Sequence, residues 1–198
     1  MPGLSQLKKF NKDILSLGDE ITLRSARGEQ PIKFPIPKDV EEKLLRFGRA
    51  AVPVINERDD YKFEIGKGNI LKEGTDVTII ATGLMVNEAL MAYEELKAEG
   101  ISARVVNMAT IKPIDRDLVI DSAKKTGVIV TAEEHNVIGG LGSAVAEVVC
   151  ETVPVPVLRV GVEDTFGKSG PAVQLLHEFG LDAANIVAKC KQAVTLKK

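Results

Sequence analysis

TAEEHNVIGGLGSAVAE, residues 131–147, joins an apolar run to a helix through a polar segment and a glycine-rich turn. The run before it, TGVIVT at residues 126–131, has the length and β-branched content of a buried strand. Strand, polar segment, glycines and helix follow one another in many phosphate-binding sites, because backbone N–H groups at a helix N-terminus attract anions. The same order also lets a helix pack closely on a sheet, so both interpretations stay open at this point.

The strand–helix unit repeats along the chain. Apolar runs predict strands at residues 76–83, 102–110, 128–134 and 155–162. Helical periodicity predicts helices at residues 84–100, 111–127, 140–151, 170–180 and 182–194. Strands that alternate with crossover helices form a parallel sheet that is covered on both faces. The pattern therefore predicts an α/β fold, a three-layer α/β/α arrangement with a mostly parallel, about five-stranded sheet.

Several residues mark where these elements begin or end. Asp115 is expected to cap the N-terminus of a helix that Gly127 ends. Gly100 is expected to end the helix before it. Pro171 suits a first helical turn, because proline lacks the N–H group that would be unpaired there. Pro156 places the last strand near an edge of the sheet.

Composition limits the classes of protein and partner. The 198 residues support one domain of ordinary size plus an appendage. The net charge of −2 and the lack of a basic block argue against nucleic acid as a partner. No apolar stretch approaches the roughly 20 residues that span a bilayer, and the first residues lack the apolar core of a secretory signal, so no membrane association is expected.

The cysteines and histidines are few and scattered. Cys150 and Cys190 fall in separate helical runs, which predicts two reduced side chains in a cytoplasmic protein. His177 falls inside a predicted helix, where we expect it on the surface. Two histidines and two separated cysteines give no ligand cluster, so no metal site is expected.

The turn GGLGS contains Gly139, Gly140 and Gly142, whose N–H groups are candidates for an anion site. Their spacing differs from the G-x-G-x-x-G of dinucleotide-binding folds, and no phosphate-loop lysine follows. Small side chains here would also let the helix approach another backbone closely. The residues favour this packing interpretation over phosphate binding.

Glu133, Glu134 and His135 are candidates for an acid–base set, because they lie at the C-terminal end of a strand, where open α/β sheets bind ligands. Adjacent carboxylates on a loop are more commonly just solvated. No nucleophile lies nearby, and Ser143 lacks the G-x-S-x-G context of a serine nucleophile. We therefore expect no catalytic residue here, and His135 and the three glycines remain candidates for an anion or interface loop.

Two further sets of residues are candidates for phosphate contacts. Arg46 and Arg49 have guanidinium groups that suit bidentate phosphate binding, although a surface pair is the simpler interpretation. An anion or nucleotide site at the strand ends would use Thr82, Gly83 and Lys168 with the backbone of residues 139–142.

Four segments resemble, in this order, the C-terminal section of transketolase. They are LLRFGRAAVPVI (44–55), IGKGNILKEGTDVTIIATGLMVNEALMAYEELKAEGISARVVNMATIKPID (65–115), TAEEHNVIGGLGSAVAEVV (131–149) and DTFGKSGPAVQLLHEFGLDAANI (164–186). Related C-terminal domains occur in deoxyxylulose-phosphate synthases and in 2-oxoacid dehydrogenase beta subunits. NMATIKPID and FGKSG favour transketolase, and the resemblance runs from Arg46 to the C-terminus.

The resemblance implies a reaction and a place for this section in the enzyme. Transketolases of the pentose phosphate pathway transfer a two-carbon ketol unit between sugar phosphates, with thiamine diphosphate and a divalent metal such as Mg²⁺. The cofactor lies between a diphosphate-binding and a pyrimidine-binding domain across a dimer, and the C-terminal domain supplies no cofactor ligand. Arg49 takes the place of a substrate-phosphate-contacting arginine, and GGLGSAVAE is assigned to a packing helix.

The resemblance also divides the chain. Residues 1–45 form an irregular segment, a remnant or linker; residues 46–70 form the end of the pyrimidine-binding domain and a linker; residues 71–198 form the C-terminal-like domain. Gly18-Asp19-Glu20 departs from the Gly-Asp-Gly start of the family's diphosphate-binding motif. We therefore expect this chain alone to bind no cofactor and to be inactive.

The expected partner is a chain that carries the diphosphate- and pyrimidine-binding domains. Homodimer contacts are also expected, because apolar surfaces that face those domains would be exposed on a separate chain. One alternative, from a different class, is a non-catalytic binding or regulatory module. Another is the C-terminal part of a deoxyxylulose-phosphate synthase or of a 2-oxoacid dehydrogenase beta subunit.

Overall fold

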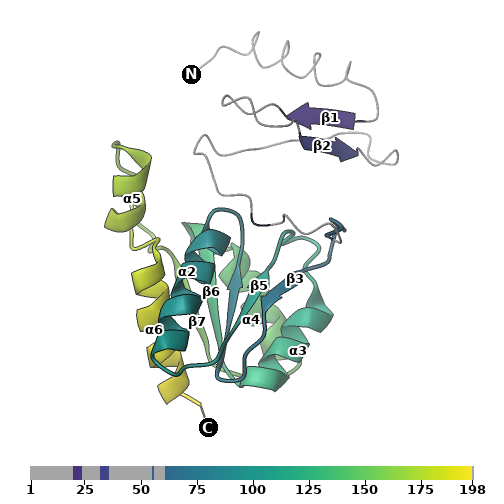
Figure 1. Ribbon diagram of the computed structural model, residues 1–198, viewed down its shortest axis with the longest axis vertical. Helices are drawn as coiled ribbons and strands as arrows, with labels where there is room; N and C mark the ends of the chain where they lie inside the picture. The colour runs from purple at the N-terminus through teal and green to yellow at the C-terminus, as the bar shows by residue number, and fades with distance from the viewer. Residues whose placement is uncertain (1–19, 24–31, 36–54, 56–60, 198) are drawn as a thin grey trace. The chain divides into compact units, whose positions relative to one another are not determined.

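The computed structural model of the chain describes residues 20–23, 32–35, 55 and 61–197 (Figure 1). The chain divides into two compact units, Met1–Arg49 and Ala50–Lys198, which are described separately. The second unit contains every residue of the candidate site that the structure describes.

The first unit contains a short two-stranded sheet. Its strands are β1 (Glu20–Leu23) and β2 (Ile32–Pro35). They pair antiparallel, with Glu20 opposite Pro35 and Leu23 opposite Ile32. Residues 1–45 were expected to form an irregular segment, and each of these strands has only four residues.

The second unit is built on a five-stranded sheet with the strand order β3-β5-β4-β6-β7. Its strands are β3 (Asn69–Lys72), β4 (Val77–Ala81), β5 (Ala103–Asn107), β6 (Ile129–Asn136) and β7 (Val157–Val162). The last four are parallel, and β3 lies antiparallel to β5 at one edge. The predicted mostly parallel sheet is confirmed, and β7, which Pro156 precedes, forms the other edge.

Helices cover both faces of this sheet and complete the predicted three layers (Figure 1). The covering helices are α2 (Met85–Ala98), α3 (Arg116–Thr126), α4 (Leu141–Glu151) and α6 (Ala183–Thr195). The short helix α5 (Ala172–Glu178) has no buried residue and lies clear of the sheet. One hydrophobic core joins α2 and α6 to the sheet, and a second core joins α3 and α4 to it. Every residue of β4 and β5 is buried, as a continuous apolar run between two helix layers requires.

Helix boundaries follow the capping residues that the sequence predicted. The Asp115 side chain accepts a hydrogen bond from the N–H of Leu118 at 3.1 Å, and Gly127 ends α3 with a φ of +71°. Gly100, with a φ of +82°, follows the last turn of α2. Pro171 occupies the N-cap of α5, one residue before the first turn in which the sequence placed it.

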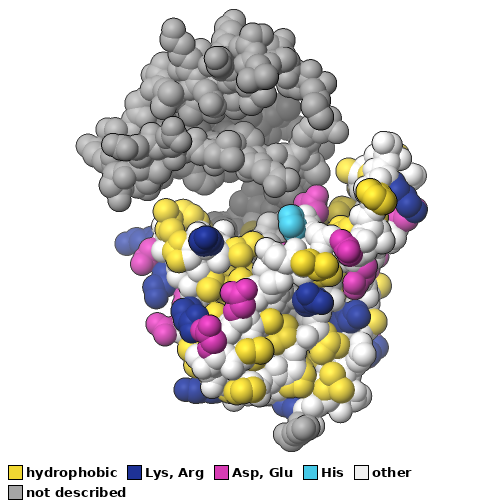
Figure 2. All heavy atoms as spheres, turned by 180° about the vertical axis from the view of Figure 1, so that it is seen from behind, with side chains coloured by type: hydrophobic (Ala, Val, Ile, Leu, Met, Phe, Trp, Pro, Cys, Tyr) yellow, Lys and Arg dark blue, Asp and Glu magenta, His cyan; other side chains and the backbone are white. Residues whose placement is uncertain are grey.

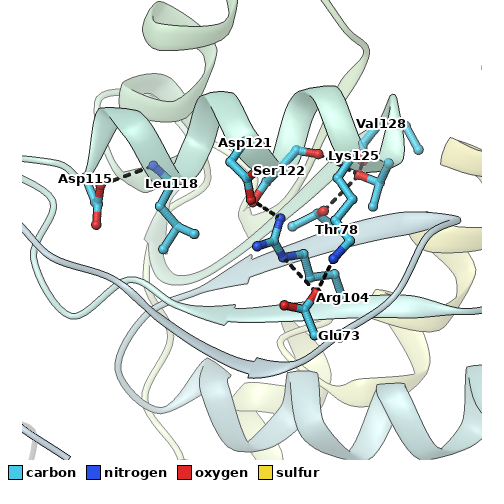
Figure 3. Close-up of polar contacts among 10 residues, drawn as sticks. Glu73, Thr78, Arg104, Asp115, Leu118, Asp121, Ser122, Lys125 and Val128 are labelled. Atoms are coloured by element: carbon cyan, nitrogen blue, oxygen red, sulfur yellow. Dashed lines mark hydrogen bonds and ion pairs between the residues drawn. The ribbon is translucent and has the colours of Figure 1, made fainter.

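A buried arginine, which the sequence analysis did not single out, joins the sheet to α3 (Figure 3). Arg104 of β5 is 2% exposed, and its Nη1 donates to Oδ2 of Asp121 at 2.7 Å. Its Nε lies 3.6 Å from Oε2 of Glu73, which also accepts from Lys125 at 2.5 Å. A buried guanidinium is tolerated only where carboxylates compensate for its lost hydration. A single arginine inside an apolar strand is the sequence signal for such a network.

The surface over α3 and α4 carries both signs of charge. Figure 2 shows this face, with Lys and Arg interspersed among Asp, Glu and hydrophobic side chains. The described part of this face therefore offers no one-sided positive surface for a nucleic acid backbone. None of the described helices combines the length and the hydropathy that crossing a membrane requires.

Asp115→Ala tests the link between α3 and the edge of the sheet. The Asp115 carboxylate caps α3 and also accepts from the N–H of Gly68, just before β3, at 3.0 Å. We expect the free energy of unfolding to fall by about 1–2 kcal/mol, because two N–H groups lose their acceptor. Urea denaturation followed by circular dichroism measures the change. The control is Asp117→Ala in the exposed part of the same turn, and equal losses in both variants would contradict the capping role.

Candidate functional site

The carboxyl ends of β4 and β6 meet at a hollow of about 330 Å³. Its lining includes Thr82 and Gly83 after β4, Glu134 and His135 of β6, and Gly139 and Gly140 of the turn. Adjacent parallel strands end at one edge of the sheet, which is why residues about 50 positions apart come together here. Gly142 and Lys168, which the sequence analysis grouped with them, are not part of the lining.

Glu133 is the residue around which the glycine-rich turn is built. It lies within β6 rather than on a loop, and it is 1% exposed. Its Oε2 accepts the N–H of Leu141 at 2.7 Å, and its Oε1 accepts the N–H of Gly142 at 2.8 Å. These are the first two N–H groups of α4, which have no partner inside the helix. The expectation that adjacent acids here are merely solvated is therefore wrong for Glu133.

The carboxylate of Glu133 takes the position that an outside anion would occupy at the N-terminus of α4. Charge-assisted hydrogen bonds and the helix dipole both favour a negative group there, which compensates for burying it. The N–H groups of Leu141 and Gly142 are engaged by this contact. Anion binding by residues 139–142 stays a prediction, with three of its backbone donors already in use, two by Glu133 and that of Gly139 by Ser143.

Gly140 makes room for the contact, and Gly142 makes room for side chains of the sheet. A Cβ atom on Gly140 would lie 1.9 Å from Oε2 of Glu133, which is far inside contact distance. A Cβ atom on Gly142 would lie 2.7 Å from Cδ of Arg159 on β7. In the structure, the two glycines allow α4 to pack directly against side chains of the sheet, whereas the packing interpretation expected a close approach to another backbone.

Three further polar groups of the turn are held by other side chains. Asn136 Oδ1 accepts the N–H of Ile138 at 2.8 Å, and Ser143 Oγ accepts that of Gly139 at 2.9 Å. The backbone carbonyl oxygen of Val137 accepts a hydrogen bond from the Arg159 guanidinium at 2.9 Å. The turn is thus fixed along its length while the side chain of Ile138 at its tip is 61% exposed.

Glu134 and His135 are exposed at the rim of the hollow. Nδ1 of His135 lies 3.0 Å from the backbone carbonyl oxygen of Asn136. A catalytic histidine is normally oriented by a further side chain and placed beside a nucleophile. Among the described residues, no side chain hydrogen-bonds to the His135 ring, and the hydroxyl of Ser143 serves the turn. The contacts observed at this edge hold the backbone in place.

The two cysteines differ in exposure and reactivity. Both are free; Cys150 is exposed on α4, and Cys190 is buried on α6. Burial raises the pKa of the Cys190 thiol to about 12, which keeps it protonated and unreactive at neutral pH. The described residues contain no group of three or more His, Cys, Asp or Glu side chains that could hold a metal ion.

Lys168 and His177 lie on the exposed segment around α5. Lys168 pairs with Glu178, and Nδ1 of His177 lies 3.0 Å from Oδ2 of Asp182. Asp182 caps α6 by accepting the N–H of Asn185. Burial raises the pKa of Asp182, but the hydrogen bond from Asn185 and the contact with His177 outweigh it, so the pKa lies below its usual value. These contacts order the segment locally.

Arg49, the predicted phosphate contact, and its neighbour Arg46 lie outside the described residues. So do Gly18 and Asp19 of the altered diphosphate motif. The role of Arg49 therefore stays a prediction.

Three comparisons place the chain among known proteins. The family model of the transketolase C-terminal domain matches residues 66–186. A 6-deoxy-6-sulfo-D-fructose transketolase subunit of Clostridium sp. (strain MSTE9) is 52% identical over 156 residues, which are 79% of this chain and 47% of the relative. A 1-deoxy-D-xylulose-5-phosphate synthase of Geobacter sulfurreducens is 37% identical over 185 residues, which are 89% of this chain and 29% of the relative.

A solved structure described as a split gene transketolase, inactive beta4 tetramer, is also similar. It matches with a TM-score of 0.73 and 56% sequence identity, over 76% of this chain and 49% of that chain. This chain thus spans about half the length of the transketolase relatives it matches.

Glu133→Gln tests the contact that forms the turn. The amide keeps one acceptor oxygen but turns an NH₂ group toward the other N–H of α4, so one hydrogen bond becomes a repulsive contact. We expect the free energy of unfolding to fall by about 2–3 kcal/mol, the cost of a buried charged hydrogen bond. Urea denaturation measures it, with the exposed neighbour in Glu134→Gln as the control, expected to change by less than about 0.5 kcal/mol. Similar values for both variants would rule out a stabilising role for the contact.

Proposed function

The chain belongs to the transketolase C-terminal domain family, and on that basis we propose that it is the C-terminal section of a split transketolase. The observation that carries the proposal is the 56% identity to a chain described as a split gene transketolase. The 52% identity to a protein named as a transketolase subunit supports it, against 37% to a deoxyxylulose-phosphate synthase.

The described residues do not fit thiamine diphosphate and its metal ion. Mg²⁺ bound to a diphosphate needs carboxylate oxygens beside a site for the phosphates. Among the described residues no group of three acidic, histidine or cysteine side chains is present, and the N-terminus of α4 already holds Glu133. We therefore propose that another chain, with the diphosphate- and pyrimidine-binding domains, holds thiamine diphosphate and Mg²⁺.

The proposed reaction of the assembled enzyme is transfer of a two-carbon ketol unit between sugar phosphates. The carbanion chemistry of such a transfer is supplied by the cofactor, and the role of this section is to support and dock the domains that bind it. One relative is named for a sulfonated sugar, so family membership does not identify the donor sugar. The sugar phosphate donor and a place in the pentose phosphate pathway are therefore proposals. We also propose a cytoplasmic location, which two free thiols support.

Without that partner, we propose that the chain associates with itself. The relative at 56% identity is described as an inactive tetramer of one kind of subunit. Self-association without activity is what a section that lacks the cofactor-binding domains would display.

Calorimetric titration with thiamine diphosphate and MgCl₂ distinguishes a section of a split transketolase from a non-catalytic module. This chain alone should give no binding below about 1 mM, because the described residues lack a suitable ligand set. Adding the chain that carries the cofactor-binding domains should produce both binding and ketol transfer. Tight binding by this chain alone would contradict the proposal, and binding without transfer would favour the non-catalytic module.

Arg49→Ala tests the proposed contact with substrate phosphate in the reconstituted enzyme. Loss of a charged hydrogen bond should raise KM for a phosphorylated acceptor about 10- to 100-fold, with kcat changed much less. Arg46→Ala, three residues away, is the matched control and should leave KM close to its original value. An unchanged KM in Arg49→Ala would remove the assignment.

A further inference from the structure

The segment between β7 and α6, residues 163–180, has little contact with the sheet. Residues 163–174 are all exposed, and α5 lies clear of the sheet (Figure 1). Leu176 and Phe179, near its end, pack partly against the core that α2 and α6 share. We call residues 163–180 the arm. A segment with so few buried apolar contacts opens easily, so the polar contacts at its base have a large share in holding it.

The base of the arm meets the N-terminus of α6 at the side chain of Asp182. Nδ1 of His177, in the last turn of α5, lies 3.0 Å from Oδ2 of Asp182. Oδ1 of the same carboxylate accepts the N–H of Asn185 at 2.9 Å and so caps α6. Between the two helices the chain turns at Gly180, whose φ is +65°. Asp182 therefore joins the last turn of the arm to the first turn of α6.

The charged groups at the base of the arm come from three elements. Asp182, the cap of α6, is the acid in contact with the His177 ring. Lys168 and Glu178, both in the arm, pair with each other. From α2, the carboxylate of Glu88 accepts the first N–H of α6 at 3.0 Å. A positive charge on the ring would therefore be balanced by Asp182, while the lysine of the arm is held by its own acid.

A histidine ring and a carboxylate make a different contact on each side of neutral pH. A protonated ring donates from Nδ1 and carries a charge, whereas a neutral ring donates from Nδ1 in only one of its two tautomers. Burial raises the pKa of Asp182, but the hydrogen bond from Asn185 and the contact with His177 outweigh it, so this pKa lies below its usual value. Asp182 is therefore charged throughout the range in which a histidine titrates, and the contact follows the protonation of the ring.

We propose that the contact between His177 and Asp182 is a pH-sensitive anchor that holds the arm to α6. The contact is complete where histidine is protonated, below about pH 6, and weakens as the pH rises through the range in which histidines lose their proton. Phe166 and Val173 are exposed on the arm, so its ordering decides how these apolar side chains are presented. Every group of the anchor belongs to this chain, so the anchor does not depend on the proposed partner.

Amide hydrogen exchange of the full chain, followed by NMR, tests the anchor. The N–H groups of Phe179, Gly180 and Leu181 close the last turn of α5 and are the reporters. Their protection factors, corrected for the intrinsic pH dependence of exchange, should fall about two- to fivefold between about pH 5.5 and pH 8, the effect expected of an exposed ion pair. The N–H of Ile101, which bonds to Leu96 at the end of α2, should keep its protection.

Three substitutions test whether His177 is responsible. His177→Gln removes the titrating ring, and Asp182→Asn removes the charge that it meets while keeping a good cap for α6. Each should abolish the pH dependence of protection in the arm. The matched control is His135→Gln, at the other of the two histidines of the chain, which should leave that dependence intact. Circular dichroism verifies that the variants are folded. Protection in the original arm that is constant with pH, or a pH dependence that persists in His177→Gln, would overturn the proposal.

Discussion

The bidentate contact between the Glu133 carboxylate and the first two N–H groups of α4 fixes the carboxyl edge of the sheet. It requires β6 to continue past residue 133 and α4 to begin at Leu141. It also leaves only a short turn between them, in which neighbouring side chains hold three further backbone groups. The outcome is a rigid turn that closes its own helix N-terminus and presents an apolar tip, a geometry suited to contact with another chain.

The sequence predicted the fold best for elements in which every residue is buried. Continuous apolar runs predicted β4 and β5, which are buried at every residue, and capping residues such as Asp115 and Gly127 located the ends of α3. The edge strand β3 was not predicted as a strand of its own, because each of its four residues is half-buried and carries no periodicity. Arg104 was missed for a related reason: a side chain that leaves an apolar strand to reach surface carboxylates shows only as an isolated interruption.

The site was harder to predict, because the preference of a helix N-terminus for a negative group fits both a bound ligand and a side chain of the protein. A helix N-terminus preceded by glycines attracts a negative group whether that group is a ligand phosphate or the protein's own carboxylate. The sequence placed Glu133 in an acidic pair and could not tell which acid is buried, since the contact spans eight and nine residues and depends on the strand's exact length. The clue lay in the glycines, because Gly140 is needed for a close neighbour rather than for a turn of the chain.

The separation of 1.9 Å between a hypothetical Cβ at position 140 and the Glu133 carboxylate has an evolutionary meaning. We expect neither position to be substituted alone, because a methyl group at 140 displaces the Glu133 carboxylate and a shorter acid at 133 no longer reaches the helix. Homologues should therefore change the two positions together or keep both. Such paired variation would distinguish chains that retain this self-capped turn from relatives that have opened it to an outside anion.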